Sequence, residues 1–132
     1  SLSILAKEKN VSIELNLEPM QIQMAREDFD QLTRNIIANA IFYNKNGGEV
    51  KITLNSSFFR CEDTGIGIEE KYQARIFERF FRVDKGRSRK DGGTGLGLAI
   101  VKHICLHYGF DLHLDSRLQE GSTFTITFHP DK

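Results

Sequence analysis

The residues best suited to chemistry in this sequence are a carboxylate and two glycines in the stretch EDTGIGIEE. The alternation of the preceding segment places Phe59, Cys61 and Asp63 on one side, so the carboxylate of Asp63 is aimed inward. A carboxylate there is costly unless it finds a hydrogen-bond donor. An adenine amino group would supply one, and Gly65 and Gly67 would let the backbone approach a flat ring. The alternative is that Asp63 only forms an Asx turn.

Two asparagines, Asn35 and Asn39, lie four positions apart on one face of a predicted helix. Asparagine is a poor helix former, so two on one face carry a propensity cost. Their side-chain oxygens are hard ligands that suit Mg²⁺, which binds few protein atoms together with phosphates and water. The alternative is a solvated surface pair.

The stretch DGGTGLGLAI, residues 91–100, raises the question of a phosphate loop. It lacks the Walker pattern, because the chain contains no Gly-Lys pair, and its GxGxG spacing after a charged run does not fit the Rossmann pattern. A glycine loop that opens a helix presents unpaired N–H groups and a positive dipole end to an anion. A flexible loop with a glycine-rich helix cap is the alternative.

A basic segment, residues 82–91, precedes these glycines and carries five basic side chains against two acidic ones. Such a segment could close over phosphates, although most charge runs are simply solvated. Before it, RIFERFF places Phe77, Phe80 and Phe81 close together. Three aromatic rings in five positions cannot all face inward on a helix, so we expect one or more to be exposed and available to a partner.

The elements that must position these residues are a mixture of strands and helices. Alternation predicts a strand at 11–17 and recurs in MQIQM at 20–24. Further strands are predicted at 49–55, 57–63, 110–116 and 122–128, and helices at 26–44 and 96–108, with a short helix after the Asp63 glycines. Gly109 is the expected C-cap of the second long helix. Hairpins between strands favour an α/β sandwich, a sheet with antiparallel pairs covered by helices on one face.

Length and composition are consistent with one domain over residues 1–132. Eighteen basic and eighteen acidic residues balance, so the net charge gives no indication of a nucleic-acid or membrane-surface protein. No apolar run approaches the roughly 20 residues that span a bilayer. The first residue is not Met, and we expect the chain to be part of a larger protein.

Four stretches, taken in order, resemble the motifs of the catalytic ATP-binding domain of sensor histidine kinases. NIIANAIFYN resembles the N box, EDTGIGI the first glycine box, RIFERFFRVD the F box and GGTGLGLAIVK the second glycine box. The resemblance covers nearly the whole chain. It implies a Bergerat-type two-layer α/β sandwich with a mixed, mostly antiparallel sheet, which binds Mg·ATP beneath a flexible ATP lid at about residues 82–93.

The resemblance also assigns roles to individual residues. Asn39 matches the Mg²⁺ ligand and is expected to act in catalysis with Arg82, an F-box arginine able to reach the γ-phosphate. Asp63 matches the adenine-reading carboxylate. The remaining nucleotide-binding positions are Asn35 and Tyr43 near the phosphates and sugar, Gly65, Gly67 and Ile68 beneath the base, Gly93, Thr94, Gly95, Leu96 and Gly97 in the phosphate-side loop, and Thr123 in GSTF as a water-mediated neighbour of the base.

One departure concerns Phe42, which stands where the N box usually carries a basic residue just before its tyrosine. A phosphate-contacting charge is then missing, and the arginines and lysines of the lid would have to compensate. We expect weaker or slower nucleotide use than is usual in the family. A nucleotide-binding regulatory or pseudokinase module stays open as an alternative.

The choice between kinase and ATPase depends on Asn35. In the ATPase branch of the superfamily a glutamate at this position activates water, and asparagine cannot take a proton. This favours phosphoryl transfer to a histidine over hydrolysis, although an anti-sigma-type serine kinase stays open. None of the four histidines lies in an H-box-like context. The acceptor is therefore expected outside this chain, and the isolated domain should bind nucleotide without phosphorylating itself.

The resemblance implies two partners, the dimerisation and histidine-phosphotransfer helices of the parent kinase and a downstream response regulator. It implies no nucleic acid and no direct membrane contact, in a cytoplasmic domain of a membrane-anchored sensor kinase.

Overall fold

The computed structural model describes residues 2–81 and 97–129. The predicted lid at about residues 82–93, with Arg82 and Gly93, lies outside these ranges, as do Thr94, Gly95 and Leu96 of the predicted phosphate-side loop. In chain order the elements are α1 (Leu2–Lys9), β1 (Ser12–Leu17), α2 (Arg26–Phe42), β2 (Glu49–Leu54), β3 (Phe58–Asp63), the short 3₁₀ helices η1 (Glu70–Tyr72) and η2 (Arg75–Phe77), α4 (Gly97–Tyr108), β4 (Asp111–Arg117) and β5 (Gly121–Thr127).

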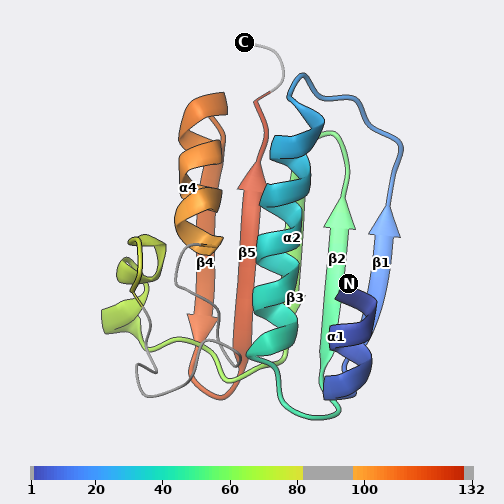
Figure 1. Ribbon diagram of the computed structural model, residues 1–132, viewed down its shortest axis with the longest axis vertical. Coiled ribbons are helices and arrows are strands. Elements are labelled where there is room, and N and C mark those ends of the chain that lie inside the picture. Colours follow the sequence, from blue (N-terminus) through green and yellow to red (C-terminus); the bar gives the residue numbers. More distant parts are fainter. Residues whose placement is uncertain (1, 82–96, 130–132) are drawn as a thin grey trace.

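The five strands form one mixed sheet in the order β1-β2-β3-β5-β4. Among the strands of residues 2–81 and 97–129, only β1 and β2 pair in parallel, and α2 provides the crossover that a parallel pair requires. The other three pairings are antiparallel. Helices α1, α2 and α4 lie side by side over one face of this sheet (Figure 1). The predicted two-layer α/β sandwich with a mostly antiparallel sheet is confirmed.

The core lies between the two layers, and each layer contributes one face. Helix α2 buries Leu32, Ile36 and Ala40, a stripe at the four-residue spacing that the sequence predicted. The sheet contributes alternate residues, such as Phe124 and Ile126 of β5. The intervening residues face the side without helices and are mainly polar, so the alternation of each strand decides which side chains reach the helical layer.

Helices α2 and α4 are joined at the start of α2 by a tyrosine. The helix begins after Ala25, which cannot cap it with a side chain. The Tyr108 hydroxyl, at the end of α4, accepts the Ala25 N–H at 3.1 Å and donates to the carboxylate of Asp28. Helix α4 ends as predicted at Gly109, whose φ of +74° is the left-handed conformation of a helix C-cap.

Three elements differ from the sequence-based expectation. Helix α1 has only one fully buried side chain, Ala6, and no pattern predicted it. Residues 20–24 alternate but pair with no described strand; Met20, Ile22 and Met24 instead pack against the core edge. The short helix expected after the Asp63 glycines consists of the two 3₁₀ turns. None of the helices in the described ranges has the length and apolar character that a bilayer crossing requires.

Candidate nucleotide-binding site

Asp63 is the last residue of strand β3, and the two oxygens of its carboxylate differ in their hydrogen bonds. Oδ1 accepts the N–H of Gly65 at 2.8 Å and the N–H of Ser122 at 3.2 Å. The first of these bonds is the Asx turn that was the alternative interpretation of this residue. Oδ2 receives no hydrogen bond from residues 2–81 or 97–129. One oxygen therefore shapes the loop, and the other is available to a ligand donor.

Burial is the largest influence on the acidity of this group, and it raises the pKa of Asp63. The two backbone N–H groups act in the opposite direction without cancelling that effect. An additional N–H donor at Oδ2 would offset part of the cost of burying the ionised carboxylate.

The glycines after Asp63 are required by crowding within the chain itself. A Cβ added to Gly65 would lie 2.5 Å from the carbonyl oxygen of Tyr43, the residue after α2. Gly67 has a φ of +73°, and an added Cβ would lie 2.0 Å from the carbonyl oxygen of Arg117. The loop is thus packed between the end of α2 and the β4–β5 hairpin, which fixes its position beside Asp63.

The residue of β5 that reaches Asp63 is Ser122. It is 6% exposed, and its hydroxyl lies 2.8 Å from that of Ser116, which also accepts the N–H of Ile68 at 2.8 Å. Thr123 pairs with Glu62 and Asp115 and faces the side of the sheet without helices. Ser122, rather than Thr123, is therefore the GSTF residue that the structure brings to Asp63. The sequence contained a signal for this placement. Phe124 and Ile126 are apolar and buried, and Ser122 lies on the same face of the strand by alternation.

The second part of the site lies on α2, the helix that packs beside α4 (Figure 1). The Asn35 amide donates to the carbonyl of Gln31 at 2.7 Å, and its Oδ1 lies 2.8 Å from the Cβ position of Gly97. The structure thus brings one N-box asparagine against the first residue of α4. The side chain of Asn39 makes no hydrogen bond within the described residues, and its carbonyl accepts the N–H of Tyr43 at 3.1 Å.

A third asparagine, Asn44, was not singled out in the sequence and has a structural role. It is 3% exposed and donates to the carbonyl of Glu49 at 2.9 Å. Its Oδ1 accepts the N–H of Lys45 and the hydroxyl of Thr64. A Cβ at Gly48 would lie 2.1 Å from this oxygen, so the position requires glycine. The Gly-Gly pair in the sequence of the turn is therefore the feature that could have indicated the structural role of Asn44.

The three aromatic residues of the F box differ in their exposure to solvent, as expected. The ring of Phe77 contacts the ring of the buried Phe124 in an edge-to-face arrangement, with ring centroids 6.2 Å apart. Phe81 packs on Tyr72 at 5.8 Å. Phe80 is 63% exposed and has a φ of +68°, unusual for a residue with a side chain. The prediction that at least one of the three is exposed is confirmed.

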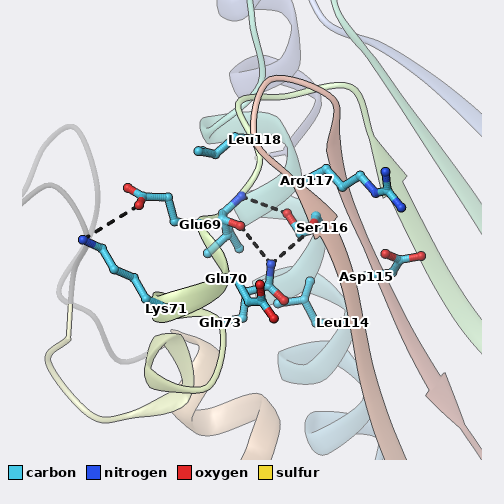
Figure 2. A pocket seen from close by; sticks show the side chains of 10 residues that line it. Glu69, Glu70, Lys71, Gln73, Leu114, Asp115, Ser116, Arg117 and Leu118 are labelled. Carbon is cyan, nitrogen blue, oxygen red and sulfur yellow. Dashed lines mark hydrogen bonds and ion pairs between the residues drawn. The ribbon is translucent and has the colours of Figure 1, made fainter.

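A groove of about 820 Å³ runs between η1 and the outer strand β4. Figure 2 shows the Gln73 side chain crossing its floor, with hydrogen bonds to the carbonyls of Ile68 at 2.9 Å and Ser116 at 3.2 Å. Neither Asp63 nor the N-box asparagines are among its lining residues. Ser116 of the groove lining contacts Ser122, whose N–H donates to Asp63, so hydrogen bonds connect the groove to the Asp63 loop.

Comparison with known proteins identifies this arrangement. Residues 24–132 match the model of the family described as histidine kinase-, DNA gyrase B- and HSP90-like ATPase. The chain belongs to this family. Its predicted likeness to the catalytic ATP-binding domain of sensor histidine kinases is confirmed by the relatives and solved structures that match it.

Three curated relatives are sensor kinases by name. The sensor-like histidine kinase SenX3 of Mycolicibacterium smegmatis is 48% identical over 103 residues, 74% of this chain. RppB of Synechocystis sp. is 51% identical over 100 residues, 73% of the chain, and WalK of Bacillus subtilis is 37% identical over 131 residues, 93% of the chain. The chain spans 27%, 22% and 21% of their respective lengths.

Two solved structures share the fold at above 25% identity. The mycobacterial sensor histidine kinase MprB matches with a TM-score of 0.79 and 27% identity, over 96% of this chain and 89% of that one. Full-length ShkA, solved in complex with AMPPNP, matches with a TM-score of 0.76 and 28% identity, over 96% of this chain and 27% of that one.

Proposed function

We propose that this domain binds Mg·ATP between Asp63 and the N-box face of α2, and transfers the γ-phosphoryl group to a histidine on dimerisation helices outside the chain. The observation that carries the proposal is the unpartnered Oδ2 of Asp63. This oxygen has no hydrogen bond from the described residues, and Asp63 is the last residue of β3, next to the loop that packs against the end of α2. An adenine amino group is a donor of the right kind.

The residues present fit the nucleotide and its metal. We assign the base to Asp63, with Ser122 beside it and Gly65, Gly67 and Ile68 in the loop below. Asn39 would hold Mg²⁺, since its amide oxygen is not used within the described residues, and Mg²⁺ would neutralise charge on the phosphates during transfer. Asn35, Tyr43 and Gly97 would border the phosphates. Arg82 at the γ-phosphate and Gly93, Thr94, Gly95 and Leu96 around the phosphates remain sequence predictions.

Transfer to histidine is favoured over hydrolysis because the site offers no base at position 35. The Asn35 amide donates to the Gln31 carbonyl, which orients it as a polar contact. A ring nitrogen of the acceptor would attack the γ-phosphorus while the bond to the bridging oxygen breaks, and ADP would leave. Catalysis then depends on positioning and charge stabilisation.

The names of the relatives support the wider context. We propose that the chain is the cytoplasmic catalytic part of a membrane-anchored sensor kinase, which works with its dimerisation helices and a downstream response regulator. The second candidate is a regulatory nucleotide-binding module with little activity. Phe42 favours it, because this position lacks the basic residue expected from the resemblance.

The decisive test is calorimetry with Mg·ATP and Mg·GTP on the wild-type chain and on Asp63→Asn. We expect the wild type to prefer ATP, since guanine presents an acceptor where adenine presents its amino group. Loss of a charge-assisted hydrogen bond of about 1.5–3 kcal/mol should weaken ATP binding in the variant by roughly 10- to 150-fold. Asp115→Asn, on the sheet face without helices, is the matched control. Retention of full ATP preference in Asp63→Asn would refute the assignment.

Phosphoryl transfer is tested separately with γ-labelled ATP. The chain alone should yield no phosphohistidine, and label should move to the dimerisation helices of the parent protein when these are added. Binding without any transfer to those helices would favour the regulatory module. Release of labelled phosphate by the chain alone would favour the ATPase branch.

A further inference from the structure

We infer that Lys9, at the end of α1, supplies positive charge to the phosphate end of the nucleotide site. The inference rests on the proposed nucleotide-binding function. Helix α2 carries no basic residue in its last turn, and Phe42 immediately precedes the Tyr43 that we place near the phosphates. The charge must therefore come from another element, and among the described residues α1 brings one to this point.

Lys9 reaches the end of α2 from 33 positions away. Its Nζ donates to the carbonyl oxygen of Phe42 at 2.8 Å and lies 5.7 Å from the centroid of the Phe42 ring. That ring meets the ring of Tyr43 edge to face, with centroids 4.9 Å apart. The ammonium group is thus at the C-terminal turn of α2, beside Tyr43, the residue of this turn that we place near the phosphates.

The backbone holds the end of α1 in this place. Asn10 follows Lys9 with a φ of +59°, which reverses the chain, and the next residue, Val11, donates its N–H to the carbonyl of Ala6 at 2.9 Å. The N–H of Gly47, in the turn after α2, donates to the carbonyl of Asn10 at 3.0 Å. These bonds attach the end of α1 to the turn between α2 and β2, so the backbone of Lys9 is held beside the end of α2.

The charge of Lys9 is not neutralised by the part of the chain that the structure describes. No carboxylate in those ranges pairs with it, and its one protein acceptor there is a neutral carbonyl. An ammonium has three donors, so two remain for other acceptors. Phosphate oxygens are stronger acceptors than a carbonyl because they are charged, and the long, flexible stem of lysine lets its head move toward them.

An electrostatic contribution of this kind should grow with the charge of the ligand. We expect Lys9→Ala to weaken binding of Mg·ATP by roughly three- to tenfold, binding of Mg·ADP by less, and binding of adenosine not at all. Lys7→Ala is the matched control, because it removes the same charge from the exposed side of the same helix. Calorimetry on all three ligands measures the series.

Three further variants separate charge from local structure. Lys9→Gln keeps an N–H donor for the Phe42 carbonyl without the charge and should behave as Lys9→Ala. Lys9→Arg keeps the charge and should bind nearly as the wild type. Phe42→Lys, placed in the Lys9→Ala background, should restore ATP affinity, since it returns a cation to the same turn of α2.

The outcomes distinguish the role of Lys9 from the proposed nucleotide-binding function. Unchanged ATP affinity in Lys9→Ala, or an equal loss for ATP and adenosine, would overturn the role of Lys9 while leaving nucleotide binding intact. If Lys9→Gln binds Mg·ATP as tightly as the wild type while Lys9→Ala binds it more weakly, Lys9 acts by capping α2. That result would overturn the role of its charge. A wild-type chain that binds none of the three ligands would overturn the proposed function, and the role of Lys9 with it.

Discussion

The proposed base end and the proposed phosphate end of the candidate site are held by different kinds of contact. At the base end, Asp63 is held by backbone N–H groups, and the neighbouring glycines face backbone atoms at 2.0–2.5 Å from their Cβ positions. At the phosphate end the contacts come from side chains. The Cβ position of Gly97 faces the tip of Asn35, and Lys9 reaches across from another helix.

This difference predicts how each end tolerates change. Backbone atoms in a paired sheet cannot move without breaking other hydrogen bonds, so the base end should be rigid and intolerant of added atoms. Side-chain tips can rotate at a cost of order 1 kcal/mol, so the phosphate end should adjust. Recognition of one base needs a rigid site. A phosphate chain that changes length and charge during the reaction is better suited by side chains that can adjust.

The largest expected effect is that of Gly121→Ala at the base end. Gly121 has a φ of +117°, and its Cβ would lie 2.0 Å from the carbonyl oxygen of Asp63. Gly109→Ala is the matched control, because its φ is also positive, at +74°, but no atom lies within 4 Å of its Cβ position. Urea unfolding should show a loss of about 1 kcal/mol for Gly109→Ala and about 3 kcal/mol or more for Gly121→Ala. Equal losses would mean that crowding at the base end is unimportant.

Asp63→Asn should change stability and binding in opposite directions. Burial raises the pKa of Asp63 in the folded state, so the folded protein binds this proton more tightly than the unfolded chain. The stability contributed by the group is therefore present below its unfolded pKa and is lost as pH rises through its folded pKa. At neutral pH the ionised carboxylate is a net cost, which the variant removes while losing its ATP preference.

Urea midpoints over a series from about pH 7 to about pH 4 measure this linkage. The urea midpoint of the variant should be higher than that of the wild type at neutral pH. The difference between the two midpoints should shrink as Asp63 of the wild type becomes protonated. Asp115→Asn controls for a general change of net charge. A variant less stable than the wild type at neutral pH would mean that the carboxylate stabilises the loop more than its burial costs.

How far the sequence predicts this site also differs between the two ends. Local alternation was sufficient to aim Asp63 inward. The same rule places Ser122, and not Thr123, on the face of β5 that Asp63 shares, which matching the GSTF motif alone does not show. The phosphate end depends on contacts between distant elements. Helix α1 buries only Ala6 fully, so no periodicity predicted it, and the Lys9–Phe42 contact spans 33 positions.

The smallest expected effect, and the sharpest test of adjustability, is that of Gly97→Ala at the phosphate end. The added Cβ would lie 2.8 Å from Oδ1 of Asn35, the far end of a side chain that can rotate. Stability should stay within about 1 kcal/mol of the wild type, because alanine also favours the helix that begins there. Affinity for Mg·ATP should fall only a few-fold, roughly the effect of a weakened hydrogen bond, with adenosine unaffected.

A double-mutant cycle with Asn35→Ala decides whether the displaced amide is the cause. Removing Asn35 also removes the atom that the new Cβ would displace, so Gly97→Ala should have no further effect on ATP affinity in that background. Additive losses would place the effect elsewhere on α4. A loss of stability as large as that of Gly121→Ala would show that both ends are equally rigid, and the proposed division between a fixed base end and an adjustable phosphate end would fail.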